Sequence, residues 1–120
     1  MDEQTHMDKF RARITSIKER EIPLEDVAES ILDDYRAAAG HLINAALAQK
    51  DLHQQNFDKL VRFLKEHPVL EHASEIRTLY DELKTIRASR VYGSKKNGEA
   101  LKRSEEILDK LKILCGYHDT

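Results

Sequence analysis

Hydrophobic and polar residues follow one another along this chain with the period of an α-helix. Phe10, Ile14 and Ile17 form an apolar stripe, which predicts a first helix that begins at about residue 8. The next stripe follows a proline, which a helix tolerates in its first turn, and it predicts a long helix over residues 24–49. This second stripe consists of Val27, Ile31, Tyr35, Ala38, Leu42 and Ala45 or Ala46.

Three further helices are expected in the second half of the chain. Asn56 is a favourable N-cap for a short helix that ends before Pro68, because the residue before a proline is displaced from the helical region. Apolar spacing then predicts helices over residues 70–90 and 99–115, separated by a glycine-containing loop, and Gly116 closes the last one. None of these helices should be stable alone, so burial of the stripes must hold them together.

These elements predict an all-α protein, an up-and-down bundle of four to five helices. Few β-branched residues occur in runs, so no strand is expected. A chain of 120 residues is long enough for one hydrophobic core. We therefore predict a single helical domain over residues 8–116, a flexible N-terminus over residues 1–7 and a tail over residues 117–120.

The side chains in the middle of the long helix are unusually small. The run Ala37–Gly40 contains three alanines and a glycine, which would let another helix approach closely in a tight crossing or a dimer seam. The alternative is that alanine simply favours the helix. The two acids that precede this run, Asp33 and Asp34, are assigned to a solvated helix face.

Composition adds expectations about the compartment. No apolar run approaches the roughly 18 residues that span a membrane, and the polar, acidic N-terminus does not resemble a signal peptide. A single cysteine, Cys115, cannot form an internal disulfide, which favours the cytoplasm. Its place among apolar residues indicates a small core or interface residue, with a reactive thiol as the alternative.

Charge is distributed unevenly along the chain. The net charge of −2 argues against a protein that coats nucleic acid through bulk electrostatics. Residues 1–34 contain ten acids and five bases, whereas residues 84–103 contain seven bases and one acid. Any electrostatic recognition should therefore come from a local patch.

The basic stretch over residues 84–103 offers the strongest candidate site. Two guanidiniums and an aromatic ring beside a lysine-rich loop can hold a phosphate and stack a base. The alternative is that Arg87 caps its own helix or pairs with Asp81 or Glu82, while the lysines solubilise the loop. The candidate residues are Arg87, Arg90, Tyr92, Lys95 and Lys96.

Other local chemistry is absent from the sequence. The six histidines show no pair one helical turn apart, so no metal site is expected. The segment GSKKNG lacks the order of a phosphate-binding P-loop, and no local arrangement supports a nucleophilic triad. We therefore expect neither a metal nor another cofactor.

Between about residues 35 and 114 the chain resembles the HEPN family, the higher eukaryote and prokaryote nucleotide-binding domains. The resemblance lies in the segments DDYRAAAGHLINAAL, FDKLVRFL and LYDELKTIRASRVYG, followed by a final helix. It implies a helical bundle that forms a homodimer and is often encoded beside a nucleotidyltransferase, as a toxin–antitoxin pair.

The resemblance also bears on catalysis. Ribonuclease members of the family carry an arginine, four residues and a histidine; here Arg87 matches the arginine and Tyr92 stands at the histidine position. A tyrosine with a pKa near 10 is a poor proton shuttle at neutral pH. The leading hypothesis is thus a non-catalytic module that binds RNA, a nucleotide or a partner protein. Alternatives are a metal-independent ribonuclease, with Arg87 stabilising the phosphate, and a helical protein–protein adaptor.

Overall fold

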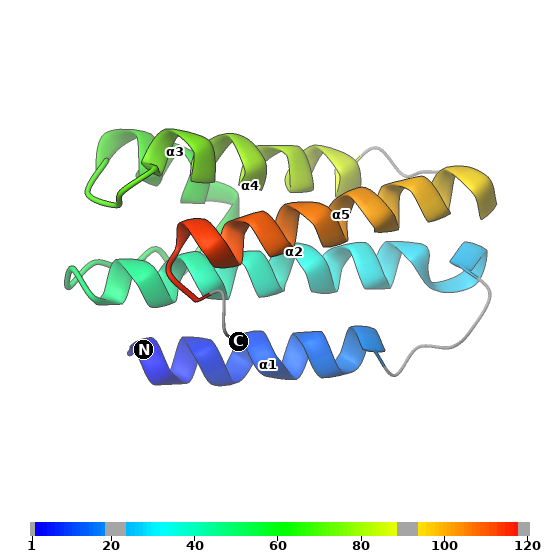
Figure 1. Cartoon of the computed structure of the whole chain (residues 1–120), viewed down its shortest axis with the longest axis horizontal. Helices are drawn as coiled ribbons and strands as arrows, with labels where there is room; N and C mark the ends of the chain where they lie inside the picture. The colour runs from blue at the N-terminus through cyan, green and yellow to red at the C-terminus, as the bar shows by residue number, and fades with distance from the viewer. Residues whose placement is uncertain (1, 19–23, 89–93, 118–120) are drawn as a thin grey trace.

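The computed structural model describes residues 2–18, 24–88 and 94–117, which form helices and their connections (Figure 1). It confirms an all-α bundle, since the described residues contain no strand. The elements in chain order are α1 (Glu3–Lys18), α2 (Leu24–Ala48), the 3₁₀ turn η1 (Phe57–Lys59), α3 (Leu60–Glu66), α4 (Ala73–Ala88) and α5 (Ser94–Leu114).

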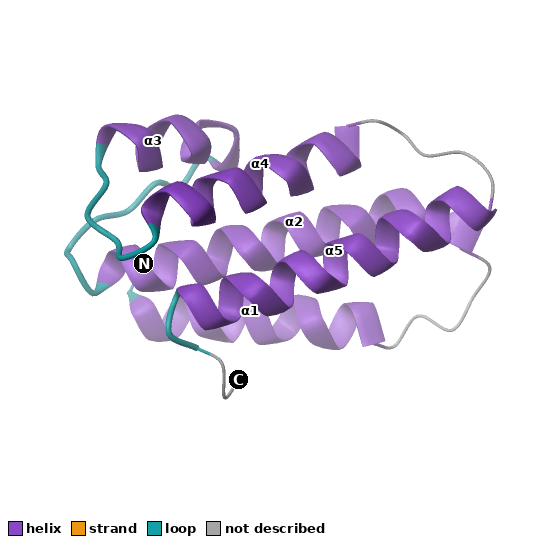
Figure 2. Ribbon diagram, turned by 45° about the horizontal axis from the view of Figure 1, so that its top comes forward, coloured by secondary structure: helices purple, strands orange, loops and turns teal. Residues whose placement is uncertain are grey.

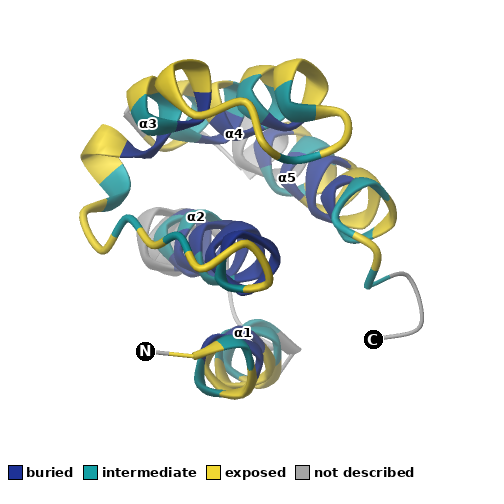
Figure 3. Cartoon of the chain, turned by 90° about the vertical axis from the view of Figure 1, so that its left-hand side faces the viewer, coloured by how far each residue is buried: buried dark blue, intermediate teal, exposed yellow. Residues whose placement is uncertain are grey.

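The helix α2 occupies the middle of the molecule. Figure 3 shows α1 on one side of α2, with α3, α4 and α5 together on the other. Among the described elements, α1 makes its extensive contacts with α2 alone, whereas α2 also packs against α4 and α5. Figure 2 shows that the helices run nearly along one direction, which agrees with an elongated molecule of 41 × 24 × 23 Å.

Because α2 lies between two layers, its apolar surface is broader than the predicted stripe. Of that stripe, Ile31, Tyr35, Ala38, Leu42 and Ala45 are buried, as expected. Residues on other faces of α2 are buried as well, because they meet the second layer. These further residues are Leu32, Ala37, Ala39, Ile43 and Leu47.

The first helix starts earlier than the sequence predicted. It begins at Glu3 rather than at about residue 8. The side chain of Asp2 accepts a hydrogen bond from the backbone N–H of Thr5 at 2.8 Å, which stabilises the helix start. His6 and Met7 are then buried, so burial extends α1 into a segment that lacks apolar periodicity.

The last helix also starts earlier than expected. It begins at Ser94 instead of residue 99, which places Lys95 and Lys96 in its first turn rather than in a loop. Gly98 inside a helix costs about 1 kcal/mol relative to alanine. A helix of 21 residues can absorb that cost because its inner face is buried. The buried residues of that face are Ala100, Ser104, Ile107, Leu108 and Leu111.

The segment after α2 packs against the small residues in the middle of that helix. Asn56 caps the turn as predicted, since its side chain accepts from the backbone N–H of Asp58 at 2.9 Å. The next side chain, Phe57, lies so close to α2 that a Cβ added to Gly40 would be 2.7 Å from its ring. The small run thus admits a close approach, by an aromatic ring of the same chain.

The C-terminal end of α5 returns to the start of α1. Gly116, at φ +86°, closes α5 as predicted, and the backbone N–H of Tyr117 donates to the carbonyl of Lys112 at 2.7 Å. The Tyr117 hydroxyl donates to the carboxylate of Glu3, and the amide of Gln49 donates to that carboxylate at 2.7 Å. In the described ranges, no helix is long and apolar enough to cross a membrane.

Candidate functional site

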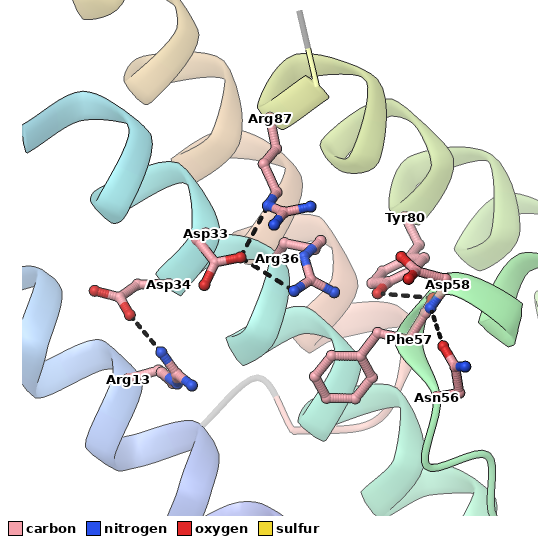
Figure 4. Close-up of polar contacts among 9 residues, drawn as sticks. All are labelled: Arg13, Asp33, Asp34, Arg36, Asn56, Phe57, Asp58, Tyr80 and Arg87. Carbon is pink, nitrogen blue, oxygen red and sulfur yellow. Dashed lines mark hydrogen bonds and ion pairs between the residues drawn. The ribbon is translucent and has the colours of Figure 1, made fainter. Parts of the chain in front are cut away.

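Arg87 lies in the last turn of α4 and points across the seam towards α2 (Figure 4). Its Nε is 2.8 Å from Oδ1 of Asp33, and its side chain is 41% exposed. The sequence offers an ion pair of Arg87 as an alternative to ligand binding, and Arg87 does form one. Its partner is Asp33 of α2, however, and neither Asp81 nor Glu82. Among the described residues, no acceptor contacts the two terminal nitrogens of Arg87.

A second guanidinium uses the same carboxylate oxygen. Arg36, one turn after Asp33 on α2, places Nη2 3.1 Å from Oδ1 of Asp33. Its guanidinium carbon lies 5.4 Å from the centre of the Phe57 ring, at cation–π distance. Its buried Nε has no hydrogen-bond partner among the described residues, a deficit that costs about 1–3 kcal/mol. Asp33 thus shares its charge between two arginines.

Tyr80 and Lys84 extend this cluster along α4. The Tyr80 hydroxyl donates to the carbonyl of Phe57 at 3.4 Å, and Nζ of Lys84 donates to the carbonyl of Asp58 at 3.3 Å. Burial raises the pKa of Tyr80 to about 12, so its phenol keeps its proton at neutral pH. Tyr80 can therefore donate a hydrogen bond but cannot accept a proton as a base.

The cluster carries an excess of positive charge. We define the α2–α4 basic cluster as Asp33, Arg36, Asp58, Lys84 and Arg87. Three of these residues are cationic and two are carboxylates, so one positive charge is left uncompensated within it. A half-exposed guanidinium whose terminal nitrogens meet no acceptor among the described residues, next to such an excess, can bind a phosphate or carboxylate.

Not all of the basic stretch contributes to this surface. Arg103 of α5 turns towards α4, where its Nη2 is 2.8 Å from Oε1 of Glu82. The hydrogen bond from this guanidinium lowers the pKa of Glu82 below its ordinary value. Arg103 therefore joins two helices, and Glu82 is occupied by Arg103 rather than by Arg87.

Of the five predicted site residues, the structure describes the side chain of Arg87 alone. Arg90 and Tyr92 lie outside the described residues, and the side chains of Lys95 and Lys96 do as well. The partners that surround Arg87 were not predicted. Their only local signal is the spacing of Asp33 and Arg36, one turn apart on a single helix.

The assignment of Asp34 to a solvated face is wrong. Only 3% of Asp34 is exposed. Its Oδ1 accepts from Nη1 of Arg13 at 2.7 Å and its Oδ2 from the hydroxyl of Ser16 at 3.1 Å. Since both partners belong to α1, the neighbouring acids of α2 face opposite layers: Asp33 meets α4 and Asp34 meets α1.

Three histidines meet although they are far apart in sequence. Nδ1 of His6 is 3.1 Å from Nδ1 of His41, and Nε2 of His6 is 3.1 Å from Nδ1 of His53. Because His6 uses nitrogens on opposite sides of its ring, the three rings form a chain and do not converge on one point. In the part of the chain that the structure describes, no group of three histidine, cysteine or acidic side chains is arranged to hold a metal ion.

Comparisons with protein-family models, with curated proteins and with solved structures found no match. The resemblance to the HEPN family therefore stays a prediction from the sequence.

Proposed function

We propose that this chain is a non-catalytic helical module that binds RNA or a nucleotide through its phosphate groups at the α2–α4 basic cluster. The observation that supports it most is that Arg87 and Arg36 share one oxygen of Asp33. An arriving phosphate would compete with Asp33 for Arg87 and would relieve the local excess of positive charge.

The sequence around the cluster supports the same proposal. Arg90, Lys95 and Lys96 follow Arg87 within ten residues, and Tyr92 supplies an aromatic ring on which a base could stack. Proton transfer has weaker support, because Tyr92 stands where the resembling family carries a histidine. Tyr80, two turns before Arg87 on α4, keeps its proton at neutral pH. The proposed role is accordingly binding without cleavage.

Fluorescence anisotropy with a labelled single-stranded RNA of mixed sequence, measured over a salt series, tests this proposal. Arg87→Ala should weaken binding several-fold and lower the slope of log K against log salt by about 0.7, the value for one phosphate contact on a single strand. Arg62→Ala is the matched control, because Arg62 lies on α3 with 85% of its side chain exposed and pairs with Glu66. It removes the same charge from another surface and should change the affinity little.

Asp33→Asn provides a change in the opposite direction. It removes the carboxylate that competes for Arg87, so RNA should bind more tightly, provided that the melting temperature shows a folded protein. Gel analysis of the RNA after incubation reads out cleavage in the same samples. Absent binding by the parent protein, an equal loss in Arg87→Ala and Arg62→Ala, or cleavage that depends on Arg87 would each contradict the proposal.

The resemblance to the HEPN family implies two partners, a second copy of this chain and a nucleotidyltransferase. We propose both. Light scattering of the purified protein tests the homodimer, for which a mass near twice 13.9 kDa is expected. Co-purification of a nucleotidyltransferase that survives nuclease treatment tests the second partner. A monomeric protein would remove the dimer while leaving the RNA-binding surface of one chain to be tested separately.

A second candidate function, a protein–protein adaptor, is favoured by a groove between α1 and α5. Its volume is about 780 Å³, and Tyr35 of α2 contributes to its lining. Apolar residues such as Ile14 and Leu108 line it together with charged residues such as Arg11 and Asp109. Ile14→Arg should abolish capture of a protein partner and leave RNA binding unchanged, which separates this function from the first.

A further inference from the structure

A chain of three histidines connects three segments of the molecule. His6 belongs to α1, His41 belongs to α2, and His53 lies in the connection between α2 and η1. The ring centres of His6 and His41 are 5.3 Å apart, and those of His6 and His53 are 4.9 Å apart. The central histidine, His6, is only 2% exposed. His6 thus holds α1 against two segments that are distant in the sequence, since His41 follows it by 35 positions and His53 by 47.

The number of protons decides whether this chain can stay closed. Each of its two hydrogen bonds needs one proton between two ring nitrogens. Three neutral imidazoles carry three protons, which leaves one for an outer nitrogen, Nε2 of His41 or Nε2 of His53. One additional proton can occupy the other outer nitrogen. A second additional proton would place two N–H groups face to face, and one hydrogen bond would be lost.

The surroundings disfavour even the first additional proton. Burial lowers the pKa of His6 to about 4, and the neighbouring charges of His53, the amino terminus and Lys9 act in the same direction, opposed by Asp2. Burial also lowers the pKa of His41 to about 4, with contributions from His6, Lys9, Arg13 and His53. The pKa of His53 is lowered as well, although its side chain is exposed, by partial desolvation of its ring and by the charge of the amino terminus. At neutral pH the chain is therefore uncharged and closed.

The helix that the histidines hold packs mainly on one neighbouring helix. The helix α1 makes its extensive contacts with α2 alone, whereas α2, α4 and α5 pack against one another. Besides its apolar face, α1 is attached by Arg13 to Asp34 and by Glu3 to Gln49 and Tyr117. Elements with few neighbours open at lower free energy than the global unfolding transition.

We propose that the chain of His6, His41 and His53 is a pH-sensitive latch, which holds α1 on α2 at neutral pH and releases it on acidification. Release would uncover the apolar faces on which α1 and α2 now meet, including Met7 and Phe10 of α1. The latch is independent of the α2–α4 basic cluster and does not rest on the proposed RNA binding.

The sign of the effect follows from proton linkage. An unfolded histidine has a pKa of about 6.5, whereas the latched His6 and His41 have values of about 4. The released state therefore binds more protons between these two values. Stability from the latch is complete above about pH 6.5 and is lost as the pH falls towards 4. Because a second additional proton breaks the chain, release should depend steeply on pH.

Hydrogen exchange resolved by segment tests the latch in the full chain. Between pH 7 and pH 5, after correction for intrinsic exchange, the protection of α1 should fall by more than about tenfold relative to α5. His6→Met replaces the central imidazole with an apolar side chain that does not titrate. It should abolish most of the pH-dependent loss of protection in α1. His72→Gln is the control, since His72 is exposed and outside the chain, and it should behave like the parent protein.

Two results would overturn the latch. One is equal loss of protection in α1 and α5 of the parent protein. The other is a parent-like loss in His6→Met, which would show that acid release does not depend on the histidine chain. If His6→Met does not fold, His53→Gln answers the same question, because His53 is exposed and its replacement removes one titrating group. It should make the pH dependence of α1 protection shallower, and an unchanged dependence would also reject the latch.

Discussion

At the scale of single residues, burial controls the chemistry of the one cysteine. Cys115 lies at the C-terminal end of α5, where burial raises the pKa of its thiol to about 12. The thiolate is the reactive form of cysteine, and very little of it exists at neutral pH when the pKa is this high. Of the two interpretations of this residue, the structure therefore favours a packed apolar side chain over a reactive thiol.

The contact between Gly40 and Phe57 yields a prediction at the same scale. Gly40→Ala would place a methyl group 2.7 Å from the Phe57 ring, well inside van der Waals distance. The gain in helix propensity is about 1 kcal/mol, whereas overpacking typically costs about 1–3 kcal/mol. We expect a net loss of about 1 kcal/mol in the free energy of unfolding, measured by urea denaturation.

A double-mutant cycle separates these two effects. Phe57→Leu removes the ring that the new methyl group would meet. In that background Gly40→Ala should become neutral or stabilising, because only the helix propensity is left. An equal cost of Gly40→Ala in both backgrounds would show that close approach of the ring is not the reason for this glycine.

At the scale of elements, the two neighbouring acids of α2 each bind a different layer of the bundle. Asp34 pairs with α1 while Asp33 pairs with α4 (Figure 4). Successive residues on a helix point about 100° apart, so one acidic pair can face two different neighbours. The central place of α2 therefore follows from its charged positions as well as from its apolar ones.

Replacement of these acids should affect stability and binding differently. Asp34→Asn removes a buried carboxylate charge from Arg13, whose own side chain is 42% exposed and can be solvated. We expect a loss of about 1–2 kcal/mol in the free energy of unfolding by urea denaturation, below the 3–5 kcal/mol of a fully buried pair. RNA affinity should stay unchanged, in contrast to Asp33→Asn; equal effects of both variants on RNA binding would contradict this division.

Most helices were predictable because the pattern that encodes them is local. Ile76, Tyr80 and Leu83, for example, recur at helical spacing and are all buried. The pairs across helices were not predictable. Asp33 and Arg87 are 54 positions apart in the sequence, and no spacing rule states which helices become neighbours. His6 was missed for the same reason, since its partners come from α2 and from a connection.

Early helix starts have a different physical origin. The first turn of α1 contains polar residues, so a search for apolar spacing ends short of it. The hydrogen bond from Thr5 to Asp2 and the burial of His6 among other imidazoles stabilise this turn. Both are contacts of polar groups, which the spacing of hydrophobic residues does not reveal.

At the scale of the whole molecule, the acidic N-terminal third and the basic stretch are less separate than the sequence implies. Asp33 belongs to the first and Arg87 to the second, and their ion pair partly neutralises both. Arg103 of the basic stretch is also partly neutralised, although its partner Glu82 belongs to α4 and not to the N-terminal third. Salt should therefore weaken contacts within the bundle as well as contacts with RNA, and the binding series needs a parallel measurement of the melting temperature.

The clasp of Tyr117, Gln49 and Glu3 brings the first and last described turns of the chain together, as Figure 1 also shows. Chain ends that lie close in space permit circular permutation. A short linker that joins Tyr117 to Asp2, with new ends in the connection over residues 67–72, would make α1 follow α5 directly. We expect this permutant to fold with a helical circular dichroism spectrum like that of the parent, whereas an unfolded permutant would contradict the clasp. In this permutant α1 would be tethered at both of its ends, to α5 and to α2, so acid would loosen the helix without freeing its N-terminal end.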